Sequence, residues 1–222
     1  MRLAEVLAHL EAAGSEQTRK TYARHGISGE CFGVSYAVLG QLRKKIKVDD
    51  ALSVELWASG IHDARVLACM VTDTAALTRV RIDSMVDAID NYALAGELGD
   101  LIARSPLLME VHDAWRCDPG EWRSAIGWRM VSALASKGNV SLDAGRAYLS
   151  EIEAGVSAAP NRTRLAMNSA MIALGGYNSC LFEDVVASSG RLGPINVDHG
   201  DTGCKTPDPV MYMQKMRARQ KA

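Results

Sequence analysis

The sequence lacks the residues that build β-sheets and the motifs that mark several common enzyme classes. Aromatic residues make up only 5% of the 222 residues, and runs of β-branched residues are scarce, which disfavours a sheet protein. No apolar run reaches the 18 residues that a membrane span needs. The patterns GxSxG and HExxH and the phosphate-binding P-loop are also missing, so the hydrolase classes built on them are disfavoured.

Paired cysteines and excess charge are missing as well. The five cysteines are odd in number and widely spaced, without a CxxC pair, which favours free thiols and a reducing, cytoplasmic location. The N-terminal stretch carries acids at amphipathic spacing and is not expected to be a signal peptide. The net charge of −1 is not the basic excess that is typical of a nucleic-acid binder.

Basic residues nevertheless gather in short groups, at residues 19–24, 43–47 and 215–221. If folding brings the first two groups together, a neutral protein would carry a basic face. Basic residues at helix C-termini also complement the helix dipole, and this interpretation applies equally to residues 43–47.

What the chain does contain is a helical pattern along most of its length. Leu52–Val71 reads as two antiparallel amphipathic helices with a turn at Ser59-Gly60, preceded by Asp49 and Asp50 as caps. A helix beginning at Arg162 is expected to end at Leu174, before the pair Gly175-Gly176. Further helices are expected over residues 1–13, 17–24, 35–47, 93–104, 107–117, 121–136, 142–154, 182–188 and 209–215.

This pattern predicts an all-α protein. Roughly ten to twelve helices, paired at a spacing of about 35–45 residues, indicate a HEAT- or armadillo-like solenoid. A compact non-repeat helical bundle is the alternative. We expect a helical repeat domain over residues 1–190, and a Gly/Pro-rich loop with a short basic C-terminal helix over 191–222, packed on the same domain.

An acidic cluster stands out in the middle of the chain. Asp83, Asp87 and Asp90 follow one another at spacings of four and three residues, which predicts one acidic helix face. Such a face needs nearby cations, which Arg79 and Arg81 can supply, or a function. Because Asp90 precedes an asparagine, a turn or capping role is the other interpretation.

Several phrases together resemble one known family. They are Tyr22–Gly26, Phe32–Val34, Leu56–Gly60 and Asp63–Arg65. In combination they resemble the DNA alkylation repair family, the HEAT-like DNA glycosylases of the AlkD type, over roughly residues 15–175. The resemblance implies a curved array of paired helices with a basic groove for duplex DNA, and hydrolysis of the N-glycosidic bond of N3- or N7-alkylated purines. It implies no cofactor.

The implied chemistry needs a carboxylate. An alkylated purine is cationic and already a good leaving group, and a carboxylate beside the sugar stabilises the oxocarbenium character that develops. The family carries this Asp in a Trp-x-x-x-Asp arrangement. One alignment makes Asp90 the carboxylate and puts Val86 at the Trp. A second alignment puts Tyr92 at the Trp and Gly96 at the Asp. We take the first as the working choice, with Asp87 as an alternative carboxylate.

The resemblance also implies DNA contacts. Trp115 and Trp122, seven residues apart across a Pro-Gly turn, look like family aromatics, although packing between helices is the alternative for Trp122 and Trp128. A further family aromatic is missing near Asn168-Ser169. The residues expected to contact DNA are Arg123, Arg129, Tyr92, Trp115, Trp122, Lys44 and Lys45.

Two function hypotheses follow. The first is a DNA glycosylase that uses Asp90. The second is a non-catalytic helical-repeat module that binds DNA or a protein partner, which the missing aromatics and neutral charge favour. No metal site is expected: Asp198, His199, Asp201 and Cys204 include zinc-type donors, but in a Gly-rich loop such residues more often form turns.

Overall fold

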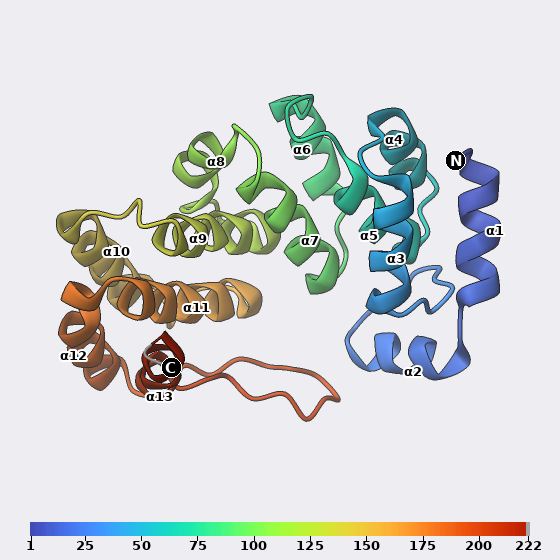
Figure 1. Cartoon of the computed structure of the whole chain (residues 1–222). Helices are drawn as coiled ribbons and strands as arrows, with labels where there is room; N and C mark the ends of the chain where they lie inside the picture. Colours follow the sequence, from blue (N-terminus) through green and yellow to red (C-terminus); the bar gives the residue numbers. More distant parts are fainter. Residues whose placement is uncertain (221–222) are drawn as a thin grey trace. The chain divides into compact units, whose positions relative to one another are not determined.

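The computed structural model describes residues 1–220, with side chains through Arg219, and this part of the chain is all-helical (Figure 1). It contains 13 α-helices and one 3-10 helix and no strand within the described residues. None of these helices combines the length and apolar character that a membrane crossing requires. The helices belong to two compact units, the first made of residues 1–107 and 199–203, the second of 108–198 and the chain from Cys204 onward.

The first unit holds seven helices, most of which begin at a side-chain cap. The caps Ser15, Ser35, Asp49, Thr78 and Asn91 each accept a hydrogen bond from the backbone N–H three residues later, and such a cap is worth about 1 kcal/mol. The helices are α1 Leu3–Ala13, α2 Glu16–Arg24, α3 Tyr36–Ile46, α4 Asp50–Ala58, α5 His62–Val71, α6 Arg79–Asp87 and α7 Tyr92–Ala103.

The predicted antiparallel pair is confirmed as α4 and α5. Asp49 caps α4, and the turn between the helices uses Gly60 at a φ of 78°, where glycine is free of the steric cost that other residues carry. The apolar side chains Leu56, Val66 and Leu67 are fully buried in this unit.

The prediction that three aspartates share one helix face is wrong. Asp83 lies on α6 and forms an ion pair with Arg79 at 2.9 Å, but α6 ends at Asp87. Asp90 lies beyond it, because the side chain of Asn91 caps α7 and the chain must turn between the two helices. The capping of α7 by Asn91 therefore ends the helical pattern that the spacing of the three aspartates predicted.

The second unit is centred on two long helices that pack together, α9 Glu121–Ser136 and α11 Asn161–Tyr177. Helix α8, Leu108–Trp115, lies against α9 so closely that a Cβ atom at Gly127 would overlap the backbone of Arg116. The remaining helices are α10 Leu142–Gly155, the 3-10 helix η1 Ser179–Leu181, α12 Phe182–Leu192 and α13 Pro209–Gln220.

The prediction that a helix ends before Gly175-Gly176 is also wrong. Helix α11 continues through both glycines to Tyr177, because the missing side chains make room for another helix. A Cβ atom at Gly175 would overlap the sulfur of Met213, and one at Gly176 would lie 2.7 Å from the terminal methyl of Met216. The glycines thus form a shallow recess that receives α13.

One backbone position in the first unit is strained. Lys47, the residue that ends α3, has φ 66° and ψ −132°, and it is the one non-glycine residue with positive φ among residues 1–220. A side chain in such a region costs on the order of 1–3 kcal/mol.

Candidate functional site

Asp90 lies in the turn between α6 and α7, and its side chain is exposed. The Nδ2 atom of Asn91 donates a hydrogen bond to Asp90 Oδ1 at 2.7 Å. The Oδ1 atom of Asn91 accepts the backbone N–H of Leu94 at 3.0 Å. One asparagine therefore caps α7 and orients the Asp90 carboxylate.

In the loop facing this turn, one buried carboxylate accepts three backbone N–H groups. Asp63, fully buried near the start of α5, accepts backbone N–H groups from Phe32 at 2.7 Å, Gly33 at 3.3 Å and Val34 at 2.7 Å. The Tyr22 hydroxyl donates to the Val34 carbonyl at 2.5 Å, and burial raises the pKa of Tyr22 so that it stays a donor. The separate sequence phrases around these residues are thus parts of one hydrogen-bonded structure.

Arg65 connects this structure to the turn that carries Asp90. Its guanidinium donates to the Trp57 carbonyl and to the Ala88 carbonyl, each at 3.3 Å, and lies 5.3 Å from the centre of the Trp57 ring. Ala88 is the C-cap residue of α6. Its hydrogen bond to Arg65 therefore fixes where the turn begins.

Close to the turn, His62 is a buried group at the start of α5. Its Nδ1 atom lies 3.5 Å from Asn91 Nδ2, its ring meets Tyr22 edge-on, and its Nε2 atom has no partner among the described residues. Burial lowers the pKa of His62, although the carboxylates of Asp63 and Asp90 act in the opposite direction. Burial therefore favours the neutral form of this imidazole.

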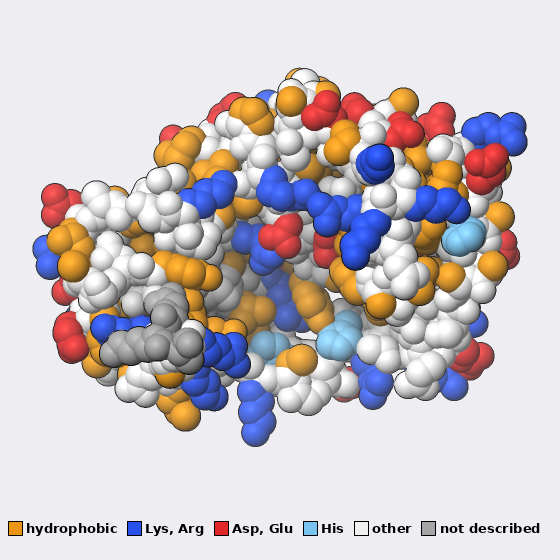
Figure 2. Space-filling view, in the orientation of Figure 1, with side chains coloured by type: hydrophobic (Ala, Val, Ile, Leu, Met, Phe, Trp, Pro, Cys, Tyr) orange, Lys and Arg blue, Asp and Glu red, His pale blue; other side chains and the backbone are white. Residues whose placement is uncertain are grey.

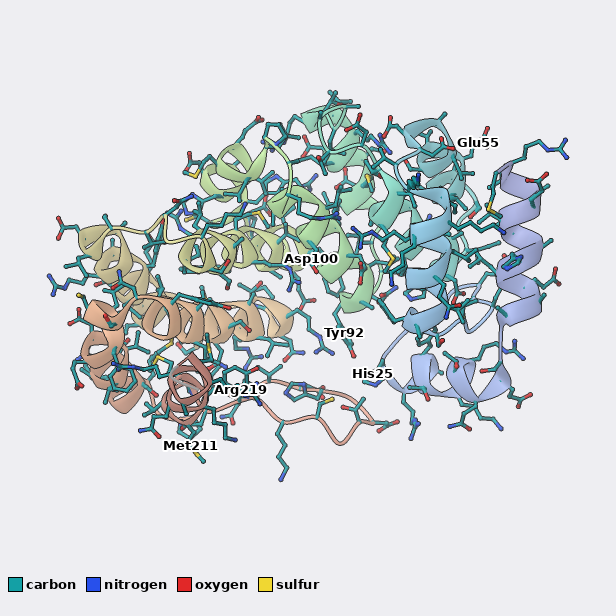
Figure 3. All side chains as sticks on the ribbon, in the orientation of Figure 1. His25, Glu55, Tyr92, Asp100, Met211 and Arg219 are labelled. Carbon is teal, nitrogen blue, oxygen red and sulfur yellow. The ribbon has the colours of Figure 1, made fainter. Side chains whose placement is uncertain are left out.

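Tyr92 and Gly96 lie on α7, one turn apart, so both face the same side of that helix. The Tyr92 hydroxyl is hydrogen-bonded to Nδ1 of His25, and Figure 3 shows the two side chains pointing toward each other. A Cβ atom at Gly96 would meet no heavy atom within 4 Å, so this position has open space around it.

The two alignments of the Trp-x-x-x-Asp arrangement therefore differ in structure. Val86 is buried on α6, with 3% exposure, while Asp90 lies outside that helix, so the two residues do not share a helix face. Tyr92 and Gly96 do. Asp87, the alternative carboxylate, is exposed at the end of α6.

In the second unit, the predicted aromatic contacts divide into buried and partly exposed residues. Trp115 is only 1% exposed and Trp128 only 2%, so their rings are packed in the interior and present no face to a base. Trp122 is partly exposed. The Arg123 guanidinium lies 5.7 Å from the centre of the Trp115 ring, and Arg129, like Arg123, is partly exposed.

Lys44 and Lys45 are both exposed in the last turn of α3. Figure 2 shows Lys and Arg side chains gathered on the visible face over this helix. Hydrogen bonds from Arg2 lower the pKa of Glu5 on α1, and the charge of Lys45 contributes to this shift. Lys45 therefore lies near an acidic neighbour.

The Gly-rich segment after α12 is fixed by its backbone. Asp198 donates its N–H to Asn161 Oδ1 at 2.7 Å, and its carbonyl accepts from Asn161 Nδ2 at 2.8 Å. Across the described residues, no three His, Cys, Asp or Glu side chains converge as a metal site would require.

Comparison with known families and proteins finds relatives that match most of this chain. Residues 6–197 match the family described as "DNA alkylation repair enzyme". Two uncharacterized proteins, Lin0241 of Listeria innocua and Lmo0209 of Listeria monocytogenes, are each 24% identical to this chain. The alignments cover 95% of both chains for the first and 96% of both for the second.

A solved structure is also similar, with a TM-score of 0.90 and 25% sequence identity over 99% of this chain and 95% of the other. It is described as belonging to "a new family of proteins related to the HEAT-like repeat DNA glycosylases with affinity for branched DNA structures". The predicted HEAT-like fold is confirmed, and the compact non-repeat bundle is not supported. The chain belongs to the DNA alkylation repair enzyme family.

Proposed function

We propose that this member of the DNA alkylation repair enzyme family binds DNA by recognising the shape and the phosphate backbone of the DNA. We also propose that it does not excise alkylated bases. The observation that carries the proposal is on α7, where the residue one turn after Tyr92 is Gly96. Of the two alignments, only this one keeps both positions on one helix face, and it leaves the carboxylate position without a functional group.

The chemistry explains why this replacement matters. Loss of an alkylated purine leaves positive charge on the sugar, and a carboxylate stabilises that charge only if it is fixed beside the sugar. Gly96 offers no such group, and its surroundings are open. Tyr92, in the position of the family's aromatic residue, has its hydroxyl bonded to His25.

The similar structure supports the choice of DNA as the partner. That protein is described as having affinity for branched DNA structures, and we extend this preference to the present chain. Recognition of this kind depends on phosphate contacts and on the form of the nucleic acid, and it needs no base-specific pocket. The exposed cations of α3 and the partly exposed Arg123 and Arg129 are the groups that we assign to phosphates.

Excision through Asp90 is the second candidate, and one observation favours it. The Asp90 carboxylate is exposed and is oriented by the Asn91 amide, as a group that stabilises a developing cation must be. The neighbouring loop leaves it accessible, since Gly29 has no side chain and a Cβ atom there would lie 3.5 Å from Asp90 Oδ2.

A binding experiment tests the first proposal. Fluorescence anisotropy compares a four-way DNA junction with a linear duplex of equal length and composition, at several salt concentrations. We expect tighter binding of the junction and a steep loss of affinity with salt. Equal, weak binding of both DNAs at low salt would contradict the proposal.

An excision experiment separates the two candidates. Release of 7-methylguanine from methylated duplex DNA is measured for the wild type, Asp90→Asn and Gly96→Asp. We expect no release from the wild type or from Asp90→Asn. Release by the wild type that is lost in Asp90→Asn would establish the second candidate, and equal release by both would exclude Asp90 from the reaction. Release gained in Gly96→Asp would support the alignment through α7.

A further inference from the structure

Four basic residues lie within five positions at the C-terminal end of α3. They are Arg43, Lys44, Lys45 and Lys47, and all four are exposed. Lys45 contributes to lowering the pKa of Glu5, after the hydrogen bonds from Arg2.

Among the side chains that the structure describes, those of Arg43, Lys44 and Lys47 make no hydrogen bond or ion pair. Elsewhere in the same unit, Lys20 is paired with Glu16 and Arg81 with Asp50. Attraction to the helix dipole explains basic residues in the last turn of α3, but it does not explain the conformation of Lys47.

That conformation is one for which the chain elsewhere uses glycine. Gly193, the C-cap residue of α12, has φ 66° and ψ −163°, close to the φ 66° and ψ −132° of Lys47, the C-cap residue of α3. Gly26, Gly60 and Gly138 follow other helix ends, also with positive φ. A lysine at such a position is kept against its backbone preference, which indicates that its side chain has a use.

We propose that Arg43, Lys44 and Lys47 form a phosphate-binding site for the DNA backbone, and that Lys47 keeps its strained conformation because its charge is needed there. This inference rests on the proposed DNA binding. An ammonium on a flexible stem contacts a phosphate as a point charge. Such contacts position DNA without reading its sequence, as a protein that recognises DNA shape requires.

The test uses three substitutions at one position. Lys47→Ala removes the charge and keeps the strain, Lys47→Arg keeps both, and Lys47→Gly removes both. Each full-length variant is titrated with a four-way DNA junction by fluorescence anisotropy between 50 and 300 mM salt. Lys20→Ala, which removes an equal charge that is paired with Glu16, is the matched control.

We expect Lys47→Ala and Lys47→Gly to lose roughly fivefold to tenfold in affinity near 0.1 M salt, with a salt slope smaller by about 0.9, the value for one phosphate contact. Lys47→Arg should stay within about twofold of the wild type, since it keeps the charge. Lys20→Ala should bind as the wild type does.

Thermal unfolding tests the strain separately, because the substitution that weakens DNA binding is expected to raise stability. Relief of the strain should raise the unfolding temperature of Lys47→Gly by about 2–4 °C, while Lys47→Ala stays near the wild type. Gly193→Ala, the reverse change at the matching end of α12, should lower it. The variant that binds DNA more weakly is thus expected to be the more stable one.

Unchanged affinity and salt slope in Lys47→Ala would overturn the phosphate site, as would an equal loss in Lys20→Ala, which would indicate a general charge effect. A fall in unfolding temperature for Lys47→Gly would overturn the strain argument. Failure of the wild type to bind any DNA would remove the proposed function, and this inference with it.

Discussion

The two units hold their irregular segments by different means. In the first unit, Asp63 alone accepts three backbone N–H groups of residues 32–34, and it is fully buried. In the second unit, three side chains of α11 form hydrogen bonds with the segment after α12. Asn161 donates to the carbonyl of Asp198, Arg164 to that of residue 196, and Asn168 to that of residue 207. In the first segment one carboxylate accepts all three N–H groups, whereas in the second each of three side chains binds a different backbone group.

This difference bears on function because the first segment faces Asp90. The carbonyls of residues 32–34 have other partners, since Arg19, Ser15 and Tyr22 donate to them, but the three N–H groups depend on one buried acid and would lose their partner together. A segment held by several side chains tolerates the loss of any one of them. Substitutions that remove these groups should therefore have very unequal effects.

The largest effect is expected for Asp63→Ala. Three backbone N–H groups, two of them on the buried residues Gly33 and Val34, would be left without an acceptor, and we expect a loss of about 3–5 kcal/mol in the free energy of unfolding. Asp63→Asn keeps one acceptor oxygen and should lose less. Urea unfolding followed by circular dichroism measures both. A loss below about 1 kcal/mol in Asp63→Ala would mean that water replaces the carboxylate, and the contrast between the units would disappear.

The second unit has its own sensitive point, and Gly175→Ala would show it. The new Cβ would overlap the sulfur of Met213, and we expect a loss of about 1–3 kcal/mol from the displaced α13. Gly155→Ala on α10 is the matched control, because its Cβ would lie 3.8 Å from Met167 Cε, an ordinary contact. The control should be neutral or slightly stabilising. Equal results for both would show that the recess for α13 adapts freely.

These glycines also show where sequence interpretation succeeds and where it fails. The helical spacing and the turn at Gly60 predicted the pair α4 and α5 correctly, because local chemistry decides them. Gly175-Gly176 has the local chemistry of a helix end, yet the helix continues, because residues almost 40 positions later supply the packing. A local pattern carries no information about such a distant partner.

The candidate site divides in the same way. Asp63 and Arg65 belong to the motif that carries the family resemblance, but the motif does not predict their hydrogen bonds. These bonds reach residues 32–34 and 88 and join segments far apart in sequence. The spacing that placed Asp90 on one helix face with Asp83 and Asp87 missed that Asn91 caps a new helix. Trp115 matched a family position, yet burial removes its ring from any base.

A smaller effect is expected for Asn161→Ala. Its two hydrogen bonds to Asp198 are exposed, so water can replace the lost partner, and we expect a loss of only about 1 kcal/mol. Ser169→Ala, also exposed on α11, provides a control that should change stability little. Differential scanning calorimetry resolves the difference. A loss as large as that of Asp63→Ala would show that the second segment also depends on one residue.

The smallest effect concerns the buried imidazole beside the first loop. Burial lowers the pKa of His62 below its usual value, while the charges of Asp63 and Asp90 partly offset the shift. The unfolded chain therefore binds a proton more readily than the folded chain does. The stability that neutral His62 contributes is complete above about pH 6.5 and is lost as the pH falls through the window down to the lowered pKa.

We accordingly expect the free energy of unfolding of the wild type to fall more steeply between pH 7.5 and 5 than that of His62→Gln, which carries no titrating group at this position. Every other histidine and carboxylate is present in both proteins, so the difference between their slopes isolates His62. Urea unfolding at five pH values measures it. Parallel slopes would mean that His62 has the same pKa in the folded and the unfolded chain. A steeper fall for His62→Gln would mean that the charges of Asp63 and Asp90 outweigh burial. Asp63 would then hold the loop of the first unit and also favour the protonated form of His62.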